Sequence, residues 1–126
     1  SDVCSSDLNS FLYKINYIDS DKCTFCKSVP ETIEHLFFDC EKVFEIWEPI
    51  KSWIQNRMNV HFDISKNIII LGSLDKEHRI INWIILLIKQ YIYKMKILNK
   101  QLSIFAIQNI IKHSMVNINI LKSRYD

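Results

Sequence analysis

The chain has 126 residues, with one glycine, two prolines, four cysteines and a formal net charge of +2. This length corresponds to one domain. One glycine excludes phosphate-binding loops of the G-x-G-x-x-G or G-x-x-x-x-G-K type and argues against a fold of many tight turns. Hydrophobic residues make up 48% of the chain, which is enough to fill a core and argues against a disordered tail. The small net charge predicts no strong overall attraction to nucleic acid or to a membrane.

Residues 1–8 are expected to be disordered and to contribute little to the core. The stretch from Asp2 to Leu8 resembles the translation of a sequencing adapter joined to a reading frame, and a natural polar tail is the alternative. On the first interpretation the genuine sequence begins near Asn9 as a fragment of a longer protein. Cys4 then drops out, and three cysteines remain.

The next residues, 9–22, mix polar and aromatic side chains without a clear period. A first helix is predicted over residues 30–38. Ser28 is a suitable cap, Pro30 is tolerated in a first turn, and Glu31 stands three residues after Ser28 as a capping-box acid.

A second helix is predicted over residues 43–58, because apolar side chains recur there at steps of three and four residues. Pro49 lies inside it and predicts a kink or a break at residues 48–49. Residues 59–75 look irregular and are interpreted as a linker region.

Two further helices are predicted, over residues 76–99 with Asp75 as cap and over residues 102–122. Short connections favour antiparallel neighbours. The most apolar run, residues 80–88, is too short for a membrane span of about 20 residues, so it is interpreted as part of a buried helix. The tryptophans are assigned to the core: Trp47, Trp53 and Trp83.

The strongest chemical signal is a C-x2-C-x8-H-x4-C pattern formed by Cys23, Cys26, His35 and Cys40. A two-residue gap lets both thiolates of a tight turn face one ion, and three cysteines with one histidine are a standard set for structural Zn²⁺. We therefore predict these four residues as zinc ligands, with no position left open for catalysis. Unrelated core cysteines are the alternative, and a redox C-x-x-C would need a βαβ pattern that is absent.

The spacing of the last two ligands predicts where the first helix ends. His35 and Cys40 are five residues apart, which is about 140° around a straight α-helix. We therefore expect the helix to end near Phe38 or Asp39, so that Cys40 turns back beside His35. Glu31 or Thr32 could hold the histidine in place, although helix capping is the favoured role for both.

These residues carry a resemblance. The C-x2-C turn, the Glu31-Thr32-x2-His35-Leu36-Phe37 segment, Cys40 and the downstream Trp47 resemble the C-terminal zinc-binding domain (CCHC type) of LINE-type non-LTR retrotransposon reverse transcriptases. The resemblance covers about residues 11–55. It implies that the intact protein is an RNA-directed DNA polymerase and that this fragment is its non-catalytic tail, which contacts RNA or DNA. It also implies an intracellular ribonucleoprotein, nuclear or cytoplasmic.

The combined expectation is a mainly α fold, in which a small zinc knuckle is followed by a bundle of about four helices. Residues 9–58 are expected to form the zinc-knuckle domain, residues 59–75 the linker region, and residues 76–126 a helical hairpin packed on the same core. The expected partners are nucleic acid and the upstream polymerase domain, with no membrane and no small-molecule substrate. A zinc-stabilised protein-interaction module and a degenerate transposon remnant remain as alternatives.

Two surfaces are candidates for contact with nucleic acid. At the tip of the knuckle the candidates are Lys22, Phe25 and Lys27, although packing of Phe25 on the adjacent helix is equally open. Residues 89–126 hold seven Lys and Arg against one Asp, and the candidates there are Lys89, Lys94 and Lys96, with Tyr91 and Tyr93 interleaved for stacking. A solvated helix face is the favoured alternative for this second surface.

Overall fold

The computed structural model describes residues 8–58, 63–73 and 79–125, with side chains described as far as Val116 in the last stretch. Within these residues every regular element is helical, so the predicted mainly α fold is confirmed. The helices are α1 (Asn9–Lys14), η2 (His35–Asp39), α2 (Glu41–Met58), α3 (Lys66–Leu71), α4 (Arg79–Leu98) and α5 (Ile104–Tyr125). None of the described helices combines the length and apolarity needed to span a lipid bilayer.

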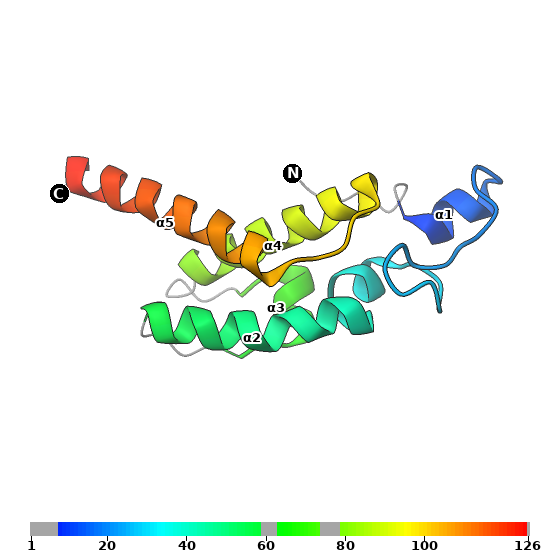
Figure 1. Cartoon of the computed structure of the whole chain (residues 1–126), viewed down its shortest axis with the longest axis horizontal. Coiled ribbons are helices and arrows are strands. Elements are labelled where there is room, and N and C mark those ends of the chain that lie inside the picture. Colours follow the sequence, from blue (N-terminus) through cyan, green and yellow to red (C-terminus); the bar gives the residue numbers. More distant parts are fainter. Residues whose placement is uncertain (1–7, 59–62, 74–78, 126) are drawn as a thin grey trace.

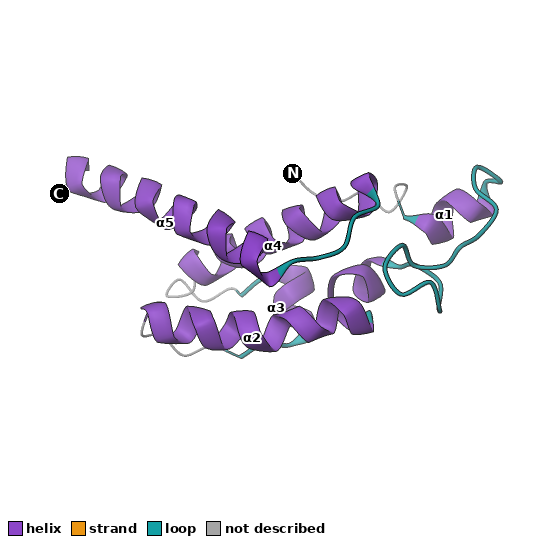
Figure 2. Cartoon of the chain, viewed as in Figure 1, coloured by secondary structure: helices purple, strands orange, loops and turns teal. Residues whose placement is uncertain are grey.

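The body of the molecule is formed by α2, α4 and α5, and the loop that holds Cys23 and Cys26 lies at one end of it (Figures 1 and 2). Apolar side chains of α2 and α4 face each other across a small internal space. The short helix η2 contacts α2, α3 and α4. The segment that carries His35 is therefore packed directly against the helical body.

The core is contributed mainly by the apolar stripes of the long helices, whose side chains are nearly inaccessible to solvent. The stripe of α2 agrees with the predicted face, and its buried members are Val43, Ile46, Trp47, Ile50 and Ile54. The stripe of α4 contributes Ile81, Ile84, Ile85, Ile88, Tyr91 and Ile92. Among the side chains of α5 that the structure describes, the buried ones are Ile107 and Ile111. Of the three tryptophans, Trp47 is buried and Trp53 half-buried, but Trp83 is 36% exposed, so its assignment to the core was wrong.

The predicted start of the first helix was also wrong. Pro30 pairs with Lys22 in an isolated antiparallel β-bridge, and helical residues begin only at Ile33. The cap is Thr32, whose Oγ1 accepts a hydrogen bond from the backbone amide of His35 at 3.2 Å. Glu31 is fully buried and forms no capping box, because burial draws its carboxylate into a different set of contacts.

Pro49 does not break the second helix. α2 continues through it to Met58, although proline removes one helix hydrogen bond. Pro49 is exposed, so its ring meets solvent and displaces no core side chain. The predicted break at residues 48–49 is absent because the buried stripe on the opposite side of α2 holds the helix together.

The region 59–75 is not wholly irregular, because it contains α3. Ser65 caps this helix, and its Oγ accepts a hydrogen bond from the amide of Ile68 at 3.3 Å. Asp75, the expected cap of the third predicted helix, lies outside the described residues.

The sequence patterns also missed α1. Leu8 precedes α1 and is only 3% exposed, so this residue joins the core against expectation, while residues 1–7 lie outside the described part of the chain.

Candidate metal centre

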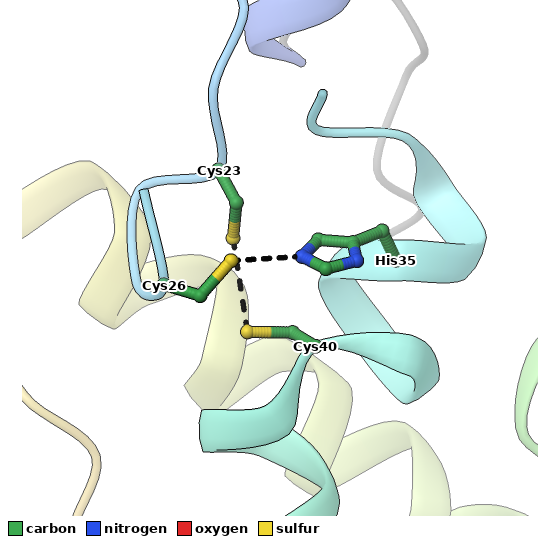
Figure 3. Close-up of side chains that lie close together, drawn as sticks. All are labelled: Cys23, Cys26, His35 and Cys40. Carbon is green, nitrogen blue, oxygen red and sulfur yellow. Dashed lines mark hydrogen bonds between the residues drawn. The ribbon is translucent and has the colours of Figure 1, made fainter. Parts of the chain in front are cut away.

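A compact turn brings the first two cysteines together. The amide of Cys23 donates to the carbonyl oxygen of Val29 at 2.8 Å, and the amide of Lys27 donates to the carbonyl oxygen of Cys23 at 3.0 Å. Lys27 adopts a left-handed conformation with φ of 58°, which lets the chain reverse without a glycine. The reversal places Cys23 and Cys26 on the same side of the turn, facing η2 (Figure 3).

A π-helical turn brings the second pair together. The amide of Cys40 donates to the carbonyl oxygen of His35 at 2.8 Å, an i→i+5 hydrogen bond. Helical backbone ends at Asp39, and Cys40 is extended with φ of −60° and ψ of 129°. The prediction that the helix ends beside Cys40 is confirmed. The turn is wider than an α-helical one, so five residues complete it and Cys40 returns next to His35.

The four side chains converge on one point (Figure 3). Their ligand atoms all lie within 4.8 Å of one another. Cys26 Sγ is 3.2 Å from His35 Nε2, and Cys23 Sγ is 3.8 Å from Cys40 Sγ. A tetrahedral zinc ion with Zn–S bonds of about 2.3 Å holds its sulfur ligands about 3.8 Å apart. The donor set and the spacing therefore fit Zn²⁺, and the three cysteines of this cluster form no disulfide.

Hydrogen bonding distinguishes two of the thiols. The thiol of Cys23 donates to the sulfur of Cys40, and this contact together with burial raises the pKa of Cys23 well above its ordinary value. The same contact lowers the pKa of Cys40, helped by backbone amides at the start of α2. Zinc binds thiolates, so binding at this site would release the proton of Cys23.

The structure bears out the expected capping role for Thr32 but not for Glu31. Thr32 caps the backbone of His35, which agrees with the favoured interpretation. Glu31 contacts the cysteine turn instead: its Oε2 accepts hydrogen bonds from the amide of Thr24 at 2.8 Å and from the Thr24 hydroxyl at 2.9 Å. The carboxylate thus fixes the backbone between Cys23 and Cys26.

The structure separates the candidate nucleic-acid contacts into two groups. Lys22, Lys27 and Lys94 are exposed, whereas Phe25 is half-buried and packs on the core. The others are tied into the fold. Lys96 is 7% exposed and forms an ion pair with Glu31 at 2.8 Å, so its assignment to a nucleic-acid surface was wrong.

Other aromatic and basic groups near this face also have structural partners. Lys89 Nζ lies 5.8 Å from the centroid of the Phe37 ring and 3.5 Å from the carbonyl oxygen of Ile70. Tyr91 is buried and its hydroxyl accepts a hydrogen bond from the amide of Ser103 at 2.9 Å, so Tyr91 offers no stacking surface. The expected basic face of α4 is therefore reduced mainly to Lys94.

Sequence reasoning missed Asn9, Thr24 and Lys96 as residues that support the cysteine turn. One signal was available for Lys96. It follows Ile88 and Ile92 at four-residue steps, so it falls on the buried stripe of α4. A charged residue on that stripe needs a buried partner of opposite charge, and only the fold shows that Glu31 supplies it.

Comparison with known proteins bears on one part of the chain. No curated protein and no solved structure gives a significant match. Residues 5–47 match the sequence model of a family described as zinc-binding in reverse transcriptase. The match includes all four converging side chains and ends at Trp47, within α2. Residues 5–47 are thus similar to the zinc-binding region of reverse transcriptases.

Proposed function

We propose that Cys23, Cys26, His35 and Cys40 hold one structural Zn²⁺. We further propose that the chain is the auxiliary zinc-binding tail of a non-LTR retrotransposon reverse transcriptase and that it binds RNA or DNA. The observation that carries the proposal is the convergence of a Cys₃His donor set inside a segment that matches a zinc-binding family of reverse transcriptases. With four protein ligands, the metal would have a structural role and the fragment itself would not be an enzyme.

The metal would stabilise the cysteine turn. Few buried apolar side chains lie between residues 9 and 35, apart from Cys23 itself. Metal binding would supply folding free energy in this region, while α2 and α4 keep their own apolar core.

Metal analysis of the purified chain tests the zinc site directly. We expect one zinc per chain, and we expect Cys26→Ser and His35→Asn to lose it. His113→Asn is the matched control, since His113 is exposed on α5 and remote in sequence from the cluster. Retention of stoichiometric zinc by both ligand variants would show that the ligand assignment is wrong.

Binding of nucleic acid is tested with the zinc-loaded chain. Affinity for single-stranded RNA or DNA should fall steeply with salt, because neutralised phosphates release counterions. Lys22→Ala combined with Lys27→Ala should weaken binding and flatten the salt dependence, by about 0.7 in slope for each phosphate of a single strand that the variant no longer neutralises. Lys112→Ala, at an exposed position of α5, is the control. Absence of binding at low salt would refute this part of the proposal.

A protein-docking role is the second candidate, and it would use apolar side chains that are strongly exposed. Tyr17, Leu71 and Phe105 are 76%, 79% and 70% exposed. Such side chains are common at contacts with other proteins when they gather in a patch. Association of the chain with the polymerase domain of the same element, in the absence of nucleic acid, would support this candidate.

The sequence upstream of Asn9 tests the proposed origin in a reverse transcriptase, since a polymerase palm motif is expected there.

A further inference from the structure

Lys96 is a lysine of α4 that the fold buries beside the cysteine turn. Its side chain is 6% exposed and its Nζ lies 2.8 Å from Oε1 of Glu31, whose side chain is fully buried. Lysine is almost never buried without a partner of opposite charge, because desolvation of the ammonium is costly. This pair joins two distant parts of the chain, one just before η2 and one near the end of α4.

The pair continues into the backbone that carries the cysteines. Glu31 accepts hydrogen bonds from the amide and the hydroxyl of Thr24, at 2.8 and 2.9 Å, and from the amide of Asn9 at 3.0 Å. Lys96 Nζ lies 3.1 Å from Asn9 Oδ1 and 3.5 Å from Thr24 Oγ1. Asn9 in turn donates from Nδ2 to the carbonyl oxygen of Lys22 at 2.7 Å. The network therefore holds the backbone on both sides of Cys23, at the carbonyl oxygen of Lys22 and at the amide of Thr24.

The charge of Glu31 depends on Lys96. Burial by itself would raise the pKa of Glu31, but hydrogen bonds from Lys96, Thr24 and Asn9 outweigh it and hold the pKa below its ordinary value. Without Lys96 the balance moves towards the neutral carboxyl, which is a weaker acceptor for the amide of Thr24. The turn would then lose its fixed position even though every cysteine is still present.

We propose that Lys96 is a positioning residue for the Cys₃His site, acting through Glu31 and Thr24 on the turn between Cys23 and Cys26. The inference rests on the proposed zinc binding and adds that zinc affinity depends on a helix outside the family match. α4 is thus part of the metal-binding unit, although its sequence carries no ligand. The role is distinct from packing, because the network ends on the backbone between two ligands.

Zinc affinity of the full chain, measured by competition with a chelator, tests this inference. Lys96→Met keeps the length of the side chain and removes its charge, and we expect affinity to fall on the order of 10- to 100-fold, as for other residues that orient ligands. The matched control is Lys94→Met, on the same helix but exposed, which should bind as the unmodified chain does. Equal affinity in both variants would overturn the inference.

A double-variant cycle separates positioning from general destabilisation. If Lys96 acts through Glu31, then Lys96→Met combined with Glu31→Gln should lose little more affinity than either single change. The absorption spectrum of bound Co²⁺ should also change in Lys96→Met, because the thiolates no longer meet the ion at the same angles. Additive losses with an unchanged spectrum would assign Lys96 to packing alone and overturn the inference.

Thr24→Val keeps the inference testable if Lys96→Met fails to fold. This change removes only the hydroxyl that both charged groups contact, and it leaves the ion pair in place. We expect a loss of zinc affinity of several-fold, and no loss would count against the network. Failure of the unmodified chain to bind zinc would instead refute the proposed function.

Discussion

The backbone amide of Cys40 donates to the carbonyl oxygen of His35 at 2.8 Å and closes a π-helical turn. This single hydrogen bond converts a spacing that points two side chains apart on an α-helix into one that places them together. The turn is stabilised from α2, where Trp47 Nε1 donates to the carbonyl oxygen of Phe37 at 2.9 Å. Wide turns of this kind are uncommon and often occur at functional sites.

Trp47→Phe should destabilise the chain and weaken zinc binding together. Trp47 is 2% exposed, so phenylalanine retains most of the apolar contact but leaves the carbonyl of Phe37 without its donor. A buried polar group without a partner costs about 1–3 kcal/mol, and the smaller ring adds a cavity. Urea unfolding and chelator competition would measure the two effects.

Trp53→Phe is the control for this prediction, because Trp53 is only half-buried and stacks with Arg57 at 5.5 Å. It should cost less in stability and leave zinc affinity unchanged. A zinc affinity that responds equally to both changes would show that the hydrogen bond to the π turn does not position His35 and Cys40.

Gly72→Ala should destabilise the chain by about 1–3 kcal/mol, and the cause is backbone strain. Gly72, the glycine that follows α3, has φ of 79° and ψ of 169°, a region that residues with a Cβ avoid. An added Cβ would meet Asn82 Oδ1 at 3.5 Å, which is ordinary contact. Thermal unfolding measures the loss, and Ser73→Ala is the control because it keeps the backbone hydrogen bonds to Asn82. A loss equal to that of the control would exclude strain.

The sequence predicted the long helices well because their buried stripes repeat at helical spacing. α2 and α4 are defined largely by local contacts, and periodicity records these directly. The sequence also predicted that the helix ends beside Cys40, since metal geometry requires His35 and Cys40 to meet. In both cases the physical cause acts over a few residues.

Long-range contacts account for what the sequence did not predict. Glu31 looked like a capping acid because Ser28 precedes it by three residues, and only the approach of α4 explains its burial. Lys96 looked like a surface cation because its partner, Glu31, is 65 residues away in the sequence and meets it only in the fold. α1 was missed since its six residues carry no periodic signal, and it is held by contacts such as the hydrogen bond from the Asn9 amide to the Glu31 carboxylate.

Pro49→Ala should stabilise the chain, because α2 is continuous through this position and proline withholds one helix hydrogen bond. Alanine is about 3 kcal/mol more favourable than proline inside a helix, and we expect a gain of about 1–3 kcal/mol. Glu48→Ala, at the neighbouring exposed position, should change stability by less than about 0.5 kcal/mol. Urea unfolding measures both, and a destabilised Pro49→Ala would mean that the helix depends on a bend at the proline.

The pair of Glu31 and Lys96 should make stability depend on pH in a defined direction. The pKa of Glu31 in the folded chain lies below its ordinary value of 4.5, so the folded state favours the carboxylate. Its contribution is fully present above about pH 4.5 and is lost as pH falls through the lowered pKa.

Glu31→Gln should cost about 3–5 kcal/mol at neutral pH, because Lys96 is left buried without a counter-charge. The difference between the two proteins should shrink below about pH 4.5. Urea unfolding across this range measures it, with Glu48→Gln, at an exposed position of α2, as a control that shows no such convergence. A difference that stays constant down to about pH 3 would mean that the Glu31 carboxylate is not what stabilises the turn.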